Sequence, residues 1–213
     1  MRTFLIIIFI ILTSGHLIGQ TPAEKLVEQA MERYEVDDYA ATLELSEQAV
    51  KSDKSYFKAY AYRGFAKFKL KNYKEALADF DRALELTKSK KNASPTEKDL
   101  ELIYLKRANC KLSLESCKAV IEDLNEAERH DPSLDEIFNN RAYARIELGD
   151  LKGAIDDIDK AIALNPNEAQ MYNNRGDIKF KLRDYKGALS DYEESVRLKP
   201  DYAVSYHSRG NAR

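Results

Sequence analysis

Hydrophobic and polar positions along this chain repeat at a fixed interval. The segment Tyr172-Asn173-Asn174-Arg175-Gly176 is similar to Phe138-Asn139-Asn140-Arg141-Ala142, which lies 34 positions earlier. Each interval contains two helix-length stretches in which apolar and small residues keep the same positions, with a short polar turn between them. The pattern therefore predicts two antiparallel amphipathic helices per unit. Because one such unit cannot bury its apolar face alone, neighbouring units are expected to stack.

The interval divides the chain into successive units. The stretch Thr21-Pro22-Ala23-Glu24 has the residues of a capping box and predicts the start of the first helix. A polar insertion at 91–100 displaces the register by ten positions. Its segment Ser94-Pro95-Thr96-Glu97 has the form of a second capping box, so the helix of the third unit is expected to start early. The complete units are 23–56, 57–90, 101–134, 135–168 and 169–202, and a partial unit covers 203–213.

Particular residue types recur at the ends and contacts of the predicted helices. When each unit is numbered from its first residue, position 27 is always small, which predicts a close approach of two helix backbones. These residues are Ala49, Ala83, Ala127, Ala161 and Ser195. A short polar residue precedes each second helix and is expected to cap it. The predicted caps are Asp38, Asn72, Ser116, Asp150 and Asp184.

The interval and the residues that keep it resemble the tetratricopeptide repeat (TPR). The resemblance covers essentially the whole chain from residue 20 to residue 213. It implies an all-α fold, a right-handed superhelical α-solenoid of antiparallel helix pairs. It also implies a non-catalytic scaffold that binds a protein or a peptide in a concave groove. A fold of this kind does not identify the ligand.

The resemblance also indicates which residues line the groove, because the first helices of TPR units do so. These residues are Met31, Phe65, Phe68, Asn109, Asn139, Tyr143, Asn173, Asp177 and Phe180. Apolar groups alternate with amides, which suits an extended or helical peptide. The alternative is that Phe68 and Phe180 pack against neighbouring first helices. The family's clamp for a C-terminal carboxylate is incomplete here, because Asn140 and Asn174 lack its basic partners, so binding of chaperone tails is not expected.

Two positions change together from unit to unit. Four complete units have Arg at position 7 and Asp at position 23, whereas the first unit has Gln29 and Leu45 there. The pattern predicts an ion pair between the two helices of each unit, with the Arg stem on apolar surface. The alternative is a ladder of Arg residues for an anionic ligand. The predicted pairs are Arg63 with Asp79, Arg107 with Asp123, Arg141 with Asp157, and Arg175 with Asp191.

The first 19 residues differ in kind from the repeats. Arg2 precedes an unbroken apolar run from Phe4 to Leu12, and small residues follow at Gly15 and Gly19. The run is about half the roughly 20 residues that span a bilayer, so residues 1–19 are interpreted as a secretory signal peptide. The protein is therefore expected to be exported and to be periplasmic, envelope-associated or secreted. No membrane span is expected once the signal peptide is removed.

Composition and motifs argue against several other functions. The net charge of −2 includes no basic stripe, so nucleic-acid binding is not expected. The three histidines, His16, His130 and His207, stand in no nucleophile or metal pattern, and no glycine-rich phosphate loop is present. We therefore expect no enzyme activity, no cofactor and no metal. Cys110 and Cys117 lie near one predicted turn, and a disulfide and a packing role for Cys117 are both compatible with the sequence.

Two further functions are compatible with the sequence. The partial unit 203–213 has a first helix without its partner helix. The chain is then either an accessory module of a longer enzyme or receptor that continues beyond residue 213, or a structural protein that self-associates through its uncapped last unit. Neither alternative requires a residue outside the repeat pattern.

Overall fold

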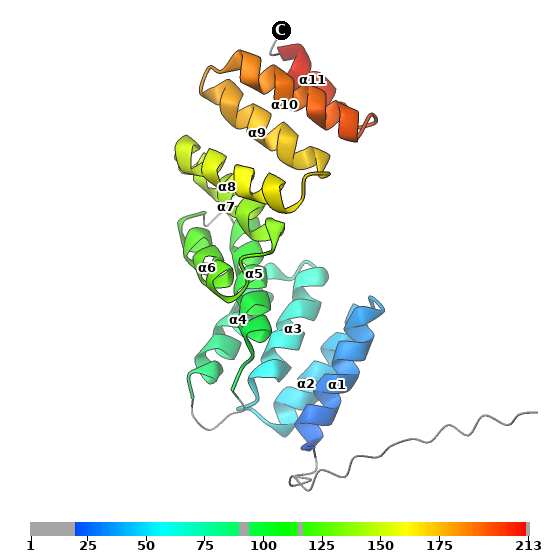
Figure 1. The fold of residues 1–213 in the computed structure, drawn as a ribbon. Helices are drawn as coiled ribbons and strands as arrows, with labels where there is room; N and C mark the ends of the chain where they lie inside the picture. The colour runs from blue at the N-terminus through cyan, green and yellow to red at the C-terminus, as the bar shows by residue number, and fades with distance from the viewer. Residues whose placement is uncertain (1–19, 90–93, 115–116, 212–213) are drawn as a thin grey trace, which may run out of the picture.

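The computed structural model describes residues 20–89, 94–114 and 117–211. These residues form eleven helices that follow one another along the chain (Figure 1). The predicted signal peptide and the predicted cap Ser116 lie outside the described residues. The helices are α1 (Pro22–Glu35), α2 (Tyr39–Ser52), α3 (Phe57–Lys69), α4 (Tyr73–Thr87), α5 (Glu97–Ser113), α6 (Cys117–His130), α7 (Asp135–Glu147), α8 (Leu151–Leu164), α9 (Ala169–Lys181), α10 (Tyr185–Leu198) and α11 (Ala203–Asn211).

The helices are arranged as pairs stacked in chain order. Each odd-numbered helix from α1 to α9 contacts the even-numbered helix that follows it, and α11 contacts both α9 and α10. The pairs form an elongated array with α1 at one end and α11 at the other (Figure 1). The predicted all-α solenoid of helix pairs is therefore confirmed.

A short turn of constant geometry joins the helices of a pair. Position 15 has a positive φ in four units: 60° at Asp37, 64° at Lys71, 81° at Gly149 and 64° at Arg183. In the fourth unit the N–H of Gly149 donates to the carbonyl of Ile146, and the next N–H donates to that of Arg145. This is a Schellman motif, which ends the first helix with a residue in the left-handed region.

The predicted caps form with two exceptions. The carboxylates of Asp38, Asp150 and Asp184 accept hydrogen bonds from backbone N–H groups of their helices. Asn72 makes no such bond, so its predicted capping role is wrong. The other exception is Ser116, which lies outside the described residues.

Both predicted capping boxes mark helix starts, but the second lies two residues later than expected. The Thr21 and Glu24 side chains form the first box as predicted. In the second box, the hydroxyl of Thr96 accepts from the N–H of Asp99 at 3.1 Å, and the Asp99 carboxylate accepts from the N–H of Thr96 at 3.0 Å. The expected pair, Ser94 with Glu97, is replaced because Glu97 is already the first residue of α5. The helix therefore does start before the third unit, as predicted.

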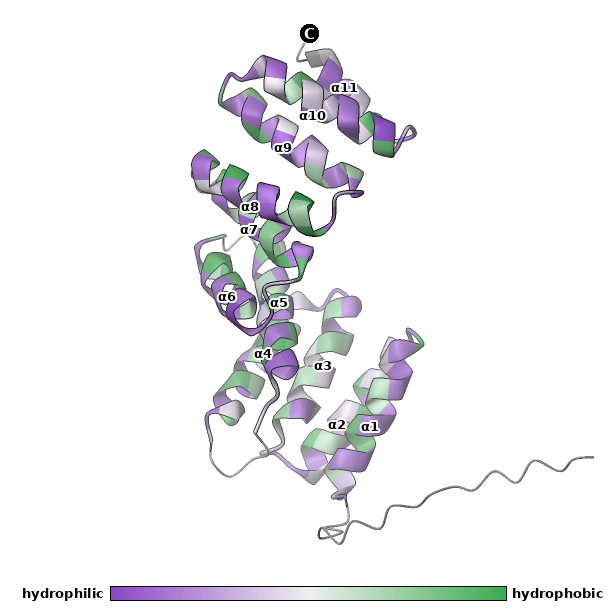
Figure 2. Cartoon of the chain, in the orientation of Figure 1, coloured by the Kyte–Doolittle hydropathy of each residue, from purple (hydrophilic) through white to green (hydrophobic). Residues whose placement is uncertain are grey.

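The core runs through the array between the stacked pairs. The small residues at position 27 are all fully buried. Every helix mixes hydrophobic and hydrophilic residues along its length, as expected for helices that are buried on one face only (Figure 2). Within the described residues, none of the helices has the length and apolar character that a bilayer crossing requires.

Candidate binding groove

The four predicted Arg–Asp pairs all form, and each joins the two helices of one unit. Arg63 Nη2 lies 2.5 Å from Asp79 Oδ1, Arg141 Nη2 lies 2.7 Å from Asp157 Oδ1, and Arg175 Nη2 lies 2.6 Å from Asp191 Oδ1. Arg107 and Asp123 form the fourth pair. All four aspartates are buried, so each pair satisfies a carboxylate inside the array.

A second cation, which the sequence interpretation missed, also binds each aspartate. This residue stands at position 11, four residues after the arginine, and is Lys67, Lys111, Arg145 or Lys179. The signal was available in the sequence, because position 11 is basic in every complete unit. Residues four apart share one face of a helix, so both cations reach the same carboxylate.

Three of the four arginines, Arg107, Arg141 and Arg175, also reach the preceding unit. Arg107 Nη1 donates to Asp81 at 2.9 Å, and Arg175 Nη1 donates to Asp159 at 2.7 Å. Each guanidinium in addition lies over the aromatic ring three residues before it, with 5.4 Å to the ring centroid in Arg107 and Tyr104. The arginines are therefore fully engaged within the fold, which argues against a ladder for an anionic ligand.

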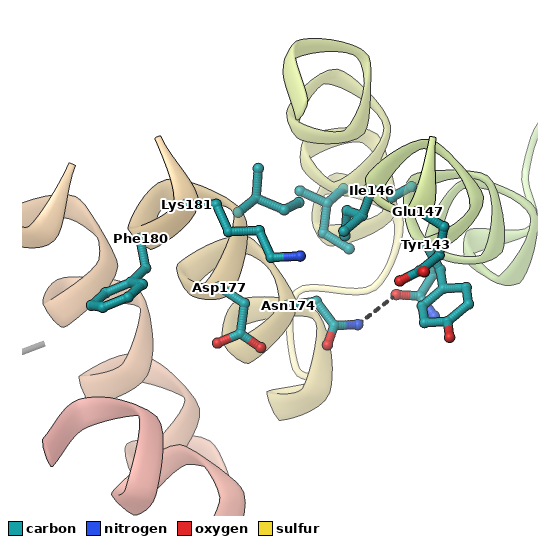
Figure 3. Close-up of a pocket in the computed structure, with 11 residues that line it drawn as sticks. Tyr143, Ile146, Glu147, Asn174, Asp177, Phe180 and Lys181 are labelled. Atoms are coloured by element: carbon teal, nitrogen blue, oxygen red, sulfur yellow. Dashed lines mark hydrogen bonds between the residues drawn. The ribbon is translucent and has the colours of Figure 1, made fainter. Parts of the chain in front are cut away.

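The odd-numbered helices line a groove that contains two cavities, which we call the first-helix groove. The N-terminal cavity, of about 380 Å³, lies between α1, α3 and α5. The C-terminal cavity, of about 310 Å³, lies between α7 and α9 (Figure 3). The backbones of α7 and α9 approach each other less closely than those of the other successive first helices.

The N-terminal cavity combines a cluster of three aromatic rings with charged side chains. Tyr34, Tyr62 and Phe65 contact one another edge-on or at a tilt, with 5.4 Å between the ring centroids of Tyr62 and Phe65. Burial, followed by the charge of Asp99, raises the pKa of Tyr62 to about 12, so its hydroxyl stays neutral at physiological pH. The other residues that line this cavity are Met31, Glu35, Thr96, Lys98, Asp99, Leu102 and Lys106.

The C-terminal cavity combines apolar groups with polar ones. Tyr143 is 54% exposed, and Ile146 and Phe180 are partly exposed. Asn174, Asp177 and Lys181 on α9 lie on the side of the space opposite Tyr143 and Glu147 on α7 (Figure 3). The other residues that line it are Asn139, Ala142, Ile158 and Ile178.

Amide side chains link successive first helices across the groove. Asn174 Nδ2 donates to Asn139 Oδ1 at 3.1 Å, the bond drawn in Figure 3. Asn140 Nδ2 donates to Asn109 Oδ1 at 2.8 Å, and Asn109 Nδ2 donates to Glu136 at 2.8 Å. Each amide has two donors and two acceptor sites, so these bonds leave capacity for a ligand.

The nine expected groove residues are distributed unevenly. Met31 and Phe65 line the N-terminal cavity, and Asn139, Tyr143, Asp177 and Phe180 line the C-terminal cavity. Phe68, Asn109 and Asn173 line neither cavity. Phe68 lies against the ring of Tyr73 with 5.6 Å between centroids, in agreement with the packing alternative.

Two of the nine residues are more buried than a contact surface requires. Phe65 is 7% exposed because its ring packs against Tyr62 and Phe80. Asn173 is 2% exposed, and its Nδ2 donates to Asp177 at 3.3 Å. The sequence interpretation also missed position 6, which contributes Tyr62, Lys106 and Asn174 to the cavities. Helical spacing gives the signal, because position 6 shares a face with positions 2, 9 and 13.

The remaining candidates for chemistry have structural contacts. Cys110 and Cys117 are free thiols, and burial raises the pKa of Cys110 to about 12. The His130 ring stacks on Tyr104, with 5.9 Å between centroids, and its Nδ1 contacts the Glu97 carboxylate. The described part of the chain contains no group of three or more His, Cys, Asp or Glu side chains placed to hold a metal ion.

Comparisons with known proteins find tetratricopeptide repeats in two parts of the chain. One match covers residues 57–87 and the other covers residues 139–203. No curated protein matches the chain in sequence. The first matched segment lies within the second unit, and the other runs from the fourth unit through the fifth to the first residue of the partial unit.

Several solved TPR proteins have the same fold. YrrB, described as a TPR protein with an unusual peptide-binding site, has a TM-score of 0.75 at 19% identity, over 88% of this chain and 92% of its own. MamA from Desulfovibrio magneticus RS-1, from residue 41 to its end, has a TM-score of 0.72 at 16% identity, over 85% and 97%. A thermophilic TPR protein from Thermus thermophilus has a TM-score of 0.59 at 16% identity, over 89% and 98%. At these identities the likeness establishes the fold.

Proposed function

We propose that this protein is a non-catalytic scaffold that binds a peptide or a segment of a protein in the first-helix groove. The observation that supports this most strongly is the C-terminal cavity. Its exposed tyrosine and apolar side chains offer packing surface, and the Asn139 and Asn174 amides beside them offer hydrogen bonds to a peptide backbone.

The fold is consistent with this function. TPR folds are typically scaffolds for protein interaction, and YrrB is described as having an unusual peptide-binding site. The arginine and lysine side chains that would otherwise suggest an anion site are already engaged with buried aspartates. These cations are therefore not available to a ligand, and we expect the ligand to contact the first-helix groove instead.

The test is capture of a partner by the immobilised full chain and by two variants. Tyr143→Ala together with Phe180→Ala removes two rings that line the C-terminal cavity. Tyr206→Ala, the matched control, removes an exposed ring from α11, outside both cavities. We expect the parent and the control to retain a partner and the double variant to lose it. Equal retention by all three would contradict the proposal, provided that circular dichroism shows equal helix content.

We also propose that the protein acts after export, in an envelope-associated, periplasmic or secreted assembly. The support is the sequence pattern of residues 1–19, which lie outside the described residues. Intact-mass measurement of the chain recovered from the exported fraction tests this. A mature chain that begins just after Gly15 or Gly19 is expected. Recovery of the uncleaved chain, only from the cytoplasmic fraction, would contradict the proposal.

A further inference from the structure

The C-terminal cavity contains charged groups that the fold itself does not pair. Glu147 and Asp177 each bring a carboxylate, and Lys181 brings one ammonium group, so the lining has a net charge of −1. None of the three forms a salt bridge within the described residues. By contrast, the buried Asp191 one helix away receives both Arg175 and Lys179.

The Asp177 carboxylate is held in a fixed position by neutral donors. Tyr192 Oη donates to Oδ1 at 2.8 Å, and Asn173 Nδ2 donates to Oδ2 at 3.3 Å. Burial and the bond to Asp177 raise the pKa of Tyr192, so its hydroxyl stays a donor at physiological pH. These bonds orient the carboxylate, and among the described residues no cation forms a salt bridge with it, although Lys181 lines the same cavity.

The negative charge of Asp177 also departs from the residue types found at the same position of the other units. Position 9 is neutral in the first four units, where it is Met31, Phe65, Asn109 and Tyr143. Asp177 is the acidic member of this series, and its charge contributes no ion pair to the fold. The carboxylate satisfies the buried Tyr192 hydroxyl, but a neutral acceptor would do the same, so the structural role does not account for its charge.

The apolar groups that line the C-terminal cavity with Asp177 determine which kind of side chain the cavity can bind. Tyr143 presents a half-exposed ring, and Ile146 and Phe180 present partly exposed apolar groups (Figure 3). A long side chain with an apolar stem and a cationic head matches both parts, since the stem packs on apolar surface and the head meets the carboxylate. An aromatic face such as that of Tyr143 also attracts a cation.

We propose that the C-terminal cavity receives a Lys or Arg side chain of the bound peptide, with Asp177 as its carboxylate partner. This inference rests on the proposed function and adds the class of ligand. The N-terminal cavity differs, because the carboxylates of Glu35 and Asp99 in its lining are balanced by the ammonium groups of Lys98 and Lys106, so that its net charge is zero. The selectivity for a cation therefore belongs to the C-terminal half of the groove.

The first step of the test selects peptides from a phage-displayed random dodecapeptide library on the full chain. Parallel selections use Asp177→Asn, which keeps an acceptor for Tyr192 but removes the charge. The matched control is Asp156→Asn, which removes one exposed charge from α8, outside both cavities. We expect Lys and Arg to be enriched in peptides selected on the parent and on the control, and not on Asp177→Asn.

The second step measures the charge contact directly. The Arg of a selected peptide is replaced by citrulline, which keeps the shape of the side chain and removes its charge. The replacement is expected to weaken binding to the parent by about tenfold and to leave binding to Asp177→Asn nearly unchanged. An equal loss in both would overturn the role of Asp177.

The outcomes separate this inference from the proposed function. Peptides that bind the groove without enrichment in Lys or Arg would overturn the inference and leave the scaffold function standing. Such binding is assigned to the groove by its loss in Tyr143→Ala with Phe180→Ala. If no peptide is selected on any form of the chain, the inference is overturned and the scaffold function loses its main support.

Discussion

The buried carboxylate of Asp157 is bound by two guanidinium groups. Arg141 donates through Nε and Nη2, and Arg145 donates through Nη1 at 2.6 Å. Asp157 is 1% exposed and Arg141 is 3% exposed. A buried ion pair adds little net stability compared with apolar residues of similar size, but removal of one partner leaves the other buried without compensation.

This asymmetry predicts the effect of two variants. Asp157→Leu is expected to lower the free energy of unfolding by about 3 kcal/mol, because it removes the buried partner of the Arg141 Nε and Nη2 groups and leaves Arg141 only the partly exposed Glu128. Adding Arg141→Gln reproduces the combination of Gln29 and Leu45 in the first unit and is expected to restore most of the loss. Urea unfolding of the parent and both variants measures this. If the double variant is no more stable than the single one, the pairing account fails.

Glu101 is a second buried carboxylate, but it lacks a cation. It is 3% exposed, and its Oε1 has no hydrogen-bond partner. Burial, followed by the charge of Asp131, raises the pKa of Glu101. The folded state therefore binds a proton more tightly than the unfolded state does. It follows that this group lowers stability as the pH rises above its unfolded pKa.

The sign of this effect can be tested with Glu101→Gln. The variant is expected to be more stable than the parent by about 1 kcal/mol at pH 7, because it removes a buried charge. The advantage should shrink as the pH falls toward 4, where the parent carboxyl becomes protonated in both states. Urea unfolding of both proteins across this range gives the difference. A difference that does not change with pH would contradict the account.

The sequence predicted these buried contacts only in part. The joint change of positions 7 and 23 predicted all four ion pairs, because the first unit lacks both members. The second cation was missed although position 11 is basic in every complete unit. The bonds to the preceding unit were not predicted, since they depend on how neighbouring pairs stack. The burial of Asn173 was also missed, because an amide at position 5 has no sequence feature that separates a bond to Asp177 from exposure.

At the scale of a helix pair, the residue at position 8 is matched to the one at position 24. Units with Gly64 and Gly176 have the aromatic residues Phe80 and Tyr192 opposite them. Units with Ala at position 8 have Ser46, Leu124 and Ile158 there. A Cβ added to Gly64 would lie 2.7 Å from Phe80 Cε1. The aromatic ring at position 24 therefore occupies the space that the absence of a Cβ at position 8 leaves.

This match predicts the effect of an alanine at residue 64. Alanine favours a helix over glycine by about 0.8–1.0 kcal/mol, whereas overpacking costs about 1–3 kcal/mol. Because Phe80 is fully buried and its ring packs against Phe65, overpacking is expected to dominate, and Gly64→Ala should lower the thermal midpoint. Thermal denaturation followed by circular dichroism measures the change.

Two controls make the result specific. Gly64→Ala with Phe80→Leu reproduces Ala108 and Leu124 of the third unit and is expected to recover the midpoint. Gly210→Ala, where an added Cβ meets nothing within 4 Å, should not lower the midpoint, because helix propensity acts there without overpacking. A midpoint that rises in Gly64→Ala alone would show that helix propensity outweighs packing.

The helix boundaries show where local sequence is sufficient. Three aspartate caps and the Thr21 box were predicted from residue type alone, because they depend on contacts three residues apart. Asn72 has a similar sequence context and does not cap. Near the insertion the sequence offers two overlapping capping boxes, Ser94 with Glu97 and Thr96 with Asp99, and the structure contains the second.

At the scale of the whole molecule, the repeat interval predicted the stacked array, because each pair needs its neighbours to bury its apolar face. The interval could not predict the two cavities. They depend on which side chains of successive first helices meet, including those at position 6, and the repeat interval does not determine this. The unpaired charge of Asp177 becomes informative only when the ion pairs of the other aspartates are known.

The most direct test of the account is photo-crosslinking of the full chain in its native compartment. Benzoylphenylalanine is placed at residue 143 in the groove, at residue 164 on the exposed part of α8, or at residue 206 on α11, all of which are 43–54% exposed large hydrophobic residues in the parent. The account predicts a crosslinked partner from residue 143 and none from residue 164. Crosslinks from residue 164 or residue 206 with none from residue 143 would contradict it.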